Sequence, residues 1–302
     1  MHPRILVVGS LNMDLVVRTP HHPALGETVL GSRFETIPGG KGANQAVAAA
    51  RLDGRVAMVG RVGGDAFGQA LTDNLARNQV DAAQVQRDPQ AASGVALITV
   101  SADGQNTIVV AMGANAELAP EDLPVERFAG AQILLLQLET PLPTVLRAAQ
   151  LAREHGMTVI LNPAPAQPLP EELYRLIDYL VPNQTELALL AGGEPAIDRA
   201  VEKLSGRGVK HIVVTLGEDG CLLAGPETHL RIPAFQVRAV DTVAAGDAFL
   251  GALAVALGEG RCLEEAARWG NAAGAIAVTR PGAQPSLPDR AELEQFLEEH
   301  PA

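Results

Sequence analysis

The segment 241–249, which reads DTVAAGDAF, combines a carboxylate with a turn of small residues. It runs directly into an apolar stretch, 250–257, that predicts a helix. The first turn of a helix has unpaired N–H groups and a partial positive charge, so an anion can bind where residues 244–246 let the backbone turn tightly. Asp247 lies in that turn, where a carboxylate can accept a proton from a substrate hydroxyl. An Asp near a helix start also occurs without any function, and this segment alone favours neither interpretation.

Other polar residues come after predicted strands, where ligands of open α/β sheets gather. Asp14 follows the apolar run 5–8, and Glu139 follows the run 133–138. Carboxylates at such positions can accept hydrogen bonds from the paired hydroxyls of a sugar, although each acid alone is more often a cap or a solvated charge. Asn44, one turn into a predicted helix, offers a donor and an acceptor to a hydroxyl.

Two further segments suit a phosphorylated ligand. Asn183 and Glu186, in PNQTE, follow a predicted strand and can orient a hydrated magnesium ion or a phosphate. An ordinary helix start capped by Asn183 explains them equally well. The segment 215–220, TLGEDG, is a strand end followed by a glycine turn, and a plain hairpin into CLLAG is the alternative.

Three common motif interpretations are excluded. PGGKGANQ at 38–45 lacks the spacing of a P-loop, and no hydroxyl residue follows Lys41. The chain contains no GxGxxG, which argues against dinucleotide binding. The histidines show no metal-ligand spacing.

These residues need a scaffold, and the pattern of elements predicts one. Strands are expected at 5–8, 55–63, 133–138, 158–161, 179–181 and 212–216, and helices after residue 40 and at 63–78, 142–155, 185–191, 195–207, 248–257, 263–279 and 289–298. This alternation predicts an α/β fold with a doubly wound, mainly parallel sheet flanked by helices. The β-rich segment 93–113, with a hairpin signal at 103–104, and a strand at 27–37 predict a small antiparallel β sheet beside it. We expect a single domain over 1–302, with this sheet, about 15–38 and 93–113, as an inserted lid.

Composition limits the environment and the partners. The 302 residues include 23 Lys and Arg against 35 Asp and Glu, a formal net charge of −12, which argues against nucleic acid or an anionic membrane as partner. Two cysteines are too few for a disulfide framework. The apolar run near the start is too short for a signal peptide, and no uncharged stretch is long enough to span a bilayer. We expect a cytoplasmic protein.

Four separated motifs, taken together, resemble a known family. GGKGANQA, NQTE at 183–186, TLGEDG and DTVAAGDAF occur in the order found in the ribokinase-like carbohydrate kinases, the PfkB family. The resemblance covers essentially the whole chain, and NMD at 12–14, LQLETP, LNPAPA and VTRPGAQPS resemble the versions found in the family's ribose kinases. It implies ATP-dependent phosphorylation of a primary hydroxyl of ribose, with Asp247 as the base and the backbone of 244–246 holding the phosphoryl group. The alternatives are a kinase of deoxyribose, fructose or a nucleoside, and a sugar sensor without catalysis.

The resemblance also assigns binding residues. The sugar would contact Asn12, Met13, Asp14, Gly40, Lys41, Gly42, Ala43, Asn44, Glu139 and Asp247. The ATP site would be lined by Asn183, Glu186, Thr215, Leu216, Gly217, Glu218, Asp219, Gly220, Ala245, Gly246 and Asn271, with Glu186 helping to place Mg²⁺.

A K⁺ ion would be held by Asp241, Val243, Ala277, Arg280, Gly282 and Ser286. The lid would cover the sugar and form a homodimer. Three positions depart from common family residues: Ala244 replaces a glycine, Ala248 a hydroxyl residue and Asn271 a histidine of some members. An alternative for Asp241 is that it caps its loop by accepting hydrogen bonds from nearby N–H groups.

Overall fold

The centre of the protein is a nine-stranded sheet, described here by a computed structural model for residues 2–225 and 228–301. Its order is β13 (Thr228–Ile232), β12 (Cys221–Gly225), β11 (His211–Thr215), β10 (Tyr179–Leu180), β9 (Thr158–Leu161), β8 (Ile133–Leu136), β1 (Arg4–Val8), β4 (Arg55–Gly63) and β5 (Asp81–Asp88). Neighbours from β11 to β5 are parallel, and β12 and β13 pair antiparallel at one edge.

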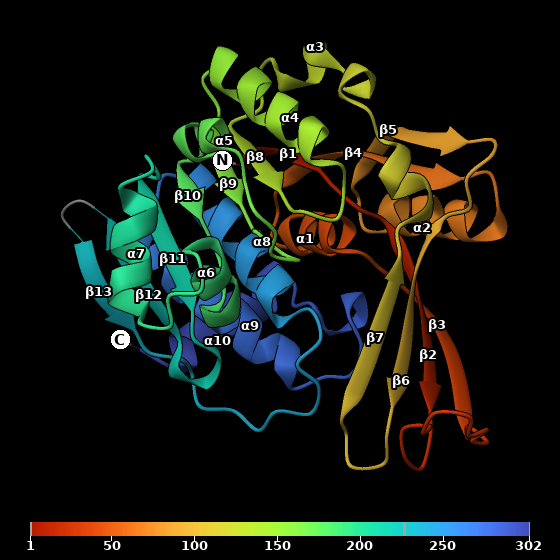
Figure 1. Ribbon diagram of the computed structural model, residues 1–302. Coiled ribbons are helices and arrows are strands. Elements are labelled where there is room, and N and C mark those ends of the chain that lie inside the picture. The colour runs from red at the N-terminus through yellow and green to blue at the C-terminus, as the bar shows by residue number, and fades with distance from the viewer. Residues whose placement is uncertain (1, 226–227, 302) are drawn as a thin grey trace.

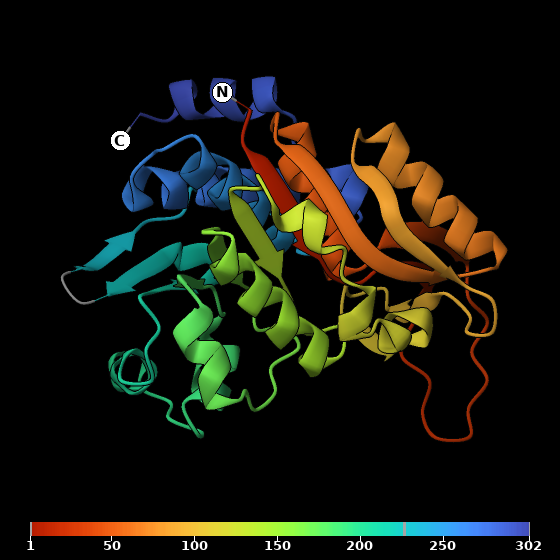
Figure 2. The ribbon, with the colours of Figure 1, turned by 90° about the horizontal axis from the view of Figure 1, so that it is seen from above.

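Helices cover both faces of this sheet, as Figure 2 shows with the blue helices on one side and the green ones on the other. One face carries α1 (Lys41–Arg51), α2 (Ala66–Arg77), α8 (Ala245–Gly258), α9 (Leu263–Val278) and α10 (Arg290–Glu299). The other carries α3 (Val125–Phe128), α4 (Leu142–Glu154), α5 (Glu171–Leu176), α6 (Gln184–Leu190) and α7 (Ile197–Ser205). The sheet separates two hydrophobic cores, one on each face, and β1 contributes to both. Ile5 and Val7 pack in one core and Leu6 in the other, because successive side chains of a strand point to opposite faces.

A four-stranded sheet projects from the body (Figure 1). Its order is β3 (Arg33–Gly39), β2 (Asn12–Arg18), β6 (Gly94–Val100) and β7 (Asn106–Ala111). The two outer pairs are antiparallel, and the central pair, β2 with β6, is parallel. The hairpin predicted around 103–104 is confirmed, with Ser101 N–H donating to the Gln105 carbonyl across the β6–β7 turn. The predicted fold class is therefore confirmed.

Several predicted element bounds were wrong. The strand expected at 27–37 begins at Arg33, because 24–27 forms a turn in which the Glu27 N–H donates to the Ala24 carbonyl. Asn12 and Asp14, expected after a strand of the main sheet, belong to strand β2 of the small one. Strands β5 and β13 were not predicted, because edge strands such as DAAQVQRD and THLRI carry few apolar residues.

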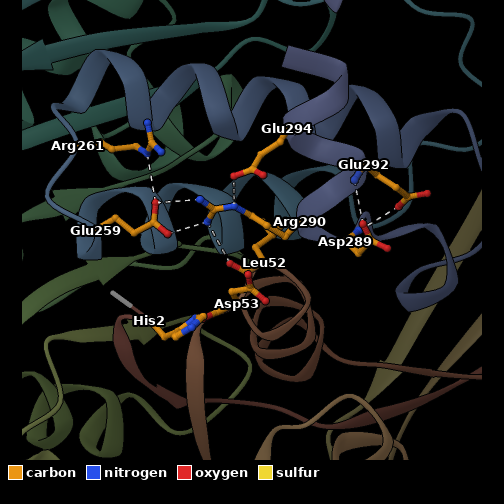
Figure 3. A network of polar contacts seen from close by, with 9 residues as sticks. All are labelled: His2, Leu52, Asp53, Glu259, Arg261, Asp289, Arg290, Glu292 and Glu294. Atoms are coloured by element: carbon orange, nitrogen blue, oxygen red, sulfur yellow. Dashed lines mark hydrogen bonds and ion pairs between the residues drawn. The ribbon is translucent and has the colours of Figure 1, made fainter. Parts of the chain in front are cut away.

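Helix α10 is fastened to the body by a charged network, shown in Figure 3. The Arg290 guanidinium contacts Glu259, at the end of α8, at 2.7 Å, and within α10 it contacts Glu294 at 2.6 Å. The guanidinium carbons of Arg290 and Arg261 lie 4.4 and 4.3 Å from the centre of the Trp269 ring. Cations over an indole ring add to ion pairing, so several interactions join the start of α10 to the body.

The fold brings the polar motifs to one edge. The carboxyl ends of β1, β8, β9 and β11 meet at the edge from which the small sheet emerges, and α1, α6 and α8 begin there (Figure 1). Ligand sites of open parallel sheets lie at such an edge. Among the described residues, no helix combines the length and apolar character that crossing a membrane requires.

Candidate active site

Helix α8 begins with an exposed turn of small residues. Ala244 precedes it in the left-handed conformation, with φ 60°, and the helix starts at Ala245. A non-glycine residue there is strained by about 1–2 kcal/mol, the kind of strain that persists at functional turns. A Cβ placed on Gly246 would have no described atom within 4 Å, so the space beside its Cα is open. The N–H groups of a helix's first turn have no partner within the helix. The turn is therefore shaped to receive an anion.

Asp247, in this first turn, is held by two neighbouring amides of α1. Its carboxylate oxygens accept hydrogen bonds from Asn44 Nδ2 and Gln45 Nε2, each at 2.9 Å. Helix α1 packs closely against the chain after β1. A Cβ on Gly42 would stand only 2.6 Å from the Ser10 backbone nitrogen, so this approach requires a glycine. Asn44, expected to hold a sugar hydroxyl, here contacts the predicted base itself.

The Glu139 carboxylate links the ends of two other elements, β1 and α1. Its Oε2 accepts from Ser10 Oγ at 2.6 Å and from the Lys41 N–H at 3.1 Å, with Asn12 Nδ2 at 3.5 Å. The start of α1, the end of β1 and the segment after β8 thus share one carboxylate. Charge-assisted hydrogen bonds of this kind fix the side chain firmly.

Asp14 lies against Gly39 and is only 7% exposed. Burial, followed by the nearby charges of Glu139 and Asp247, raises the pKa of Asp14 to about 7. It lines a cleft of about 590 Å³ between the small sheet and the segments 239–243 and 281–285. A group with a strongly shifted pKa in a cleft is typical of a functional site.

A second cavity, of about 230 Å³, opens at Asp247 and shares the lining residue Thr242 with the cleft. It is lined by Lys41, Asn162, Ala164, Val181, Asn183, Glu186, Thr215, Thr242, Ala244, Gly246, Asp247 and Leu250. Burial lowers the pKa of Lys41, but the carboxylates of Asp247, Glu139 and Glu186 outweigh burial and raise it. Lys41 thus stays positively charged beside the start of α8.

Asn183 and Glu186 take the helix-capping arrangement that was the alternative to ligand binding. Asn183 Oδ1 accepts from the Glu186 N–H at 2.8 Å, and Glu186 Oε2 accepts from the Asn183 N–H at 2.9 Å. Both also line the second cavity, where burial raises the pKa of Glu186. The cap therefore leaves them facing this space.

The segment 215–220 forms the turn of the β11–β12 hairpin, as its alternative interpretation stated. Thr215 reaches the second cavity. Gly220, with φ 91°, leaves no room for a Cβ, which would stand 2.1 Å from the Ile232 carbonyl oxygen. Asn271 donates to the carbonyls of Ile232 and Pro233 and so fixes the chain beside this turn.

The residues assigned to a cation by resemblance lie on two adjoining segments. The Asp241 carboxylate accepts from the Val243 N–H at 3.0 Å and from the Gly282 N–H at 2.9 Å, which is the loop-capping arrangement. The N–H groups of residues 240 and 241 donate to the Val278 carbonyl. Ser286 is fully buried and donates to the Ala283 carbonyl. The arrangement joins the loop before α8 to the segment after α9.

Sequence reasoning missed a set of buried uncharged side chains around Asp247. They are the amides Gln45, Gln137, Asn162 and Gln284. An amide carries no periodicity and no charge, so the pattern of the sequence did not select them. The available signal was their place inside GANQ, LQLE, LNPA and GAQP, next to residues that were chosen.

Comparison with known proteins finds carbohydrate kinases that match nearly the whole chain. The profile of the pfkB family carbohydrate kinase matches residues 2–290. The chain is 42% identical to a ribokinase of Haemophilus influenzae, with 99% of each chain covered. It is 39% identical to a deoxyribokinase of Salmonella typhi, covering 97% of this chain and 98% of the relative. The structure of Arabidopsis thaliana ribokinase complexed with ribose and ATP superposes with a TM-score of 0.92 at 36% identity, covering 99% of both chains.

Proposed function

The chain belongs to the pfkB family of carbohydrate kinases, and we propose that it transfers the γ-phosphoryl group of ATP to the primary hydroxyl of D-ribose, giving ribose 5-phosphate and ADP. The observation that carries this proposal is the position of Asp247. Its carboxylate lies in the first turn of α8 and lines the second cavity, which adjoins the cleft of Asp14 at the shared lining residue Thr242. A base between two ligand spaces is what direct phosphoryl transfer requires.

In this proposal the sugar lies in the cleft beside the small sheet. Asp14 and Glu139 accept hydrogen bonds from its hydroxyls, with Asn12, Lys41 and Asn44 completing the contacts together with the backbone and side chains of Met13, Gly40, Gly42 and Ala43. The desolvated carboxylate of Asp14 gains most from this, because two hydroxyl donors replace water that burial has removed.

ATP lies in the second cavity, with its γ-phosphate at the start of α8. Asp247 accepts the proton of the primary hydroxyl as that oxygen bonds to the γ-phosphorus and the bond to the bridging oxygen breaks, so that ADP leaves. The N–H groups of Ala245 and Gly246 and the ammonium of Lys41 stabilise the equatorial oxygens. The turn Leu216, Gly217, Glu218, Asp219 and Gly220, with Asn183, Thr215 and Asn271, lines the nucleotide's remaining length.

Mg²⁺ and K⁺ are part of the proposal. The oxygen donors of Asn183 and Glu186 at the cavity wall fit Mg²⁺, which binds mainly through phosphates and water and neutralises developing charge. For K⁺, the support is that two adjoining segments supply carbonyl oxygens and one carboxylate. The residues assigned to the ion on these segments are Asp241, Val243, Ala277, Arg280, Gly282 and Ser286. A cation there fixes the loop that leads into α8.

We also place a homodimer interface on the small sheet and the enzyme in the cytoplasm. Phe34, Leu97 and Val109 share the face of this sheet that is turned away from the cleft, and each is half-exposed or more. Exposed apolar patches of this kind mark protein–protein contacts. Light scattering on the purified protein and on Val109→Glu tests the interface: the wild type should be a dimer and the variant a monomer.

A substrate panel tests the proposed function. ADP release is measured with ribose, deoxyribose, fructose and adenosine, each with ATP and Mg²⁺, and Asp247→Asn serves as the inactive control. Ribose should give the highest kcat/KM, and ribose 5-phosphate should be the product. A second candidate, deoxyribose, is favoured by the 39% identity to a deoxyribokinase. Faster turnover of deoxyribose in the same panel would replace ribose as the substrate.

A further inference from the structure

A chain of buried amides converges on Asp247 from two sides. On one side Gln284 Nε2 donates to Asn44 Oδ1 at 3.1 Å, and Asn44 Nδ2 donates to Asp247. On the other, Gln137 Nε2 donates to Gln45 Oε1 at 2.6 Å, and Gln45 Nε2 donates to Asp247. All five side chains are at most 8% exposed.

The direction of every hydrogen bond in this chain follows from one charge. An ionised carboxylate only accepts, so Asn44 and Gln45 must both present their N–H groups to Asp247. Their carbonyl oxygens then point away and need donors, which Gln284 and Gln137 supply. Each amide is thereby held in one of its two orientations.

The far end of the chain carries a cost that this ordering explains. Gln137 Oε1 is buried and, among the described residues, has no hydrogen-bond partner. This oxygen lies 2.1 Å from the position that a Cβ on Gly9 would occupy, so the lack of a side chain at Gly9 makes room for it. Rotating the Gln137 amide would turn its oxygen, an acceptor, toward the acceptor Gln45 Oε1 and lose that hydrogen bond. The unpaired group is consistent with selection for the orientation of Gln45 rather than for stability.

We propose that Gln45 and Gln284 are positioning residues, which orient the Asp247 carboxylate and keep it ionised for proton transfer, without touching the substrate themselves. Each oxygen of Asp247 receives one amide N–H and keeps a lone pair for the sugar hydroxyl. Neutral donors hold the carboxylate without the competing charge that an arginine or lysine would bring. Gln284 acts through Asn44, and it lies in the segment 277–286 that contacts Asp241, so it joins that segment to the base.

This inference rests on the proposed role of Asp247 as the base, and kinetics can separate the two. Gln45→Leu removes the donor, and Gln45→Glu keeps the size but presents a carboxylate to Asp247. Gln284→Leu removes the partner of Asn44 and leaves Asp247 untouched. Thr144→Val is the matched control, because Thr144 is equally buried and its hydroxyl donates to the Leu118 carbonyl rather than to a member of the amide chain.

Each variant is assayed across a pH range with the panel sugar that the wild type phosphorylates fastest. For both Gln45 variants we expect kcat about 10- to 100-fold lower, a part of the ~10²–10⁴-fold that a general base contributes, with KM for sugar and ATP within about twofold. The acid limb of kcat should move to higher pH, because the ionised carboxylate has lost a donor. Gln284→Leu should lose about 3- to 10-fold in kcat with a smaller shift in the same direction.

Thermal unfolding accompanies every assay, and Thr144→Val should lose stability without losing kcat. A kcat within about twofold of wild type in Gln45→Leu and Gln45→Glu would overturn the inference. So would a loss that is the same at every pH, because that describes structural damage. If Gln45→Leu does not fold, the isosteric Gln45→Glu and the remote Gln284→Leu decide. Failure of the wild type on ribose alone refutes the proposed substrate and leaves this test in place with the preferred sugar.

Discussion

Asp14→Asn should make the unliganded protein more stable at alkaline pH while weakening sugar binding. The pKa of Asp14 is raised from 3.8 to about 7 by burial and then by the charges of Glu139 and Asp247. Between those two values the folded state binds more protons than the unfolded state, so the contribution of this carboxyl to stability falls as pH rises. An asparagine keeps the shape and carries no charge.

The magnitude follows from about 1.36 kcal/mol for each unit of pKa difference. The raised pKa destabilises the folded protein by about 4 kcal/mol at pH 8 and by about 1.7 kcal/mol at pH 5. The advantage of Asp14→Asn over wild type should therefore grow by about 2–3 kcal/mol between these pH values. Ribose affinity of the wild type should in turn rise as pH passes through 7, because the ionised form accepts two hydroxyl donors.

Urea unfolding without ligands at both pH values measures the stability, and calorimetry measures sugar binding. Glu35→Gln is the matched control, since Glu35 lies on the same small sheet, is partly exposed and pairs with Arg33. Its effect should stay within about 0.5 kcal/mol at either pH. A stability difference between Asp14→Asn and wild type that does not change with pH would refute the reasoning.

Three further outcomes are expected. Asp247→Asn should bind sugar and ATP normally but turn over about 10²–10⁴-fold more slowly; a near-normal steady-state rate would remove Asp247 from the role of base. Replacing K⁺ by tetramethylammonium at constant ionic strength should lower kcat in the wild type and have little effect in Asp241→Asn, and indifference of the wild type would argue against the cation site. Arg290→Ala should lose about 1–3 kcal/mol of stability, since Arg290 joins an ion pair to a ring contact. The control is Arg199→Ala, which removes an exposed ion-pair residue and should change the free energy of unfolding in urea little. An equal loss of stability there would contradict the role of burial.

The main sheet could be predicted from the sequence because its central strands are buried on both faces. Runs such as ILVV in β1 and ILLL in β8 are continuous apolar stretches, and helical periods separate them. The edge strands β5 and β13 escape this signal because solvent replaces one neighbour. The parallel pairing of β2 with β6 could not be foreseen either, since it joins segments about 80 residues apart and no local turn encodes it.

The charged part of the candidate site could be chosen from sequence, whereas its supporting amides could not. Glu139 and Asp247 stand at a predicted strand end and helix start, and Asp14 comes soon after the apolar run 5–8 in the sequence, where position alone suggests chemistry. The sequence does not distinguish Gln45 from any other helical glutamine, and its role depends on Gln137, which lies 92 residues away along the chain. Only the fold decides which amide meets which carboxylate. The same limit applies to the dual use of Asn183 and Glu186 as cap and cavity wall.

The site works against the overall charge of the protein, and this explains why its local groups matter so much. With a net charge of −12, the long-range field repels ATP, so attraction must come from nearby donors. Asp14, Glu139 and Asp247, which are part of that net charge, place three carboxyl groups near one another at this edge of the sheet. Lys41 and the start of α8 offset them, and Lys41 is held charged by the same carboxylates. Rate then depends on placement rather than on steering, and small displacements at this edge of the sheet should cost more than any change of surface charge.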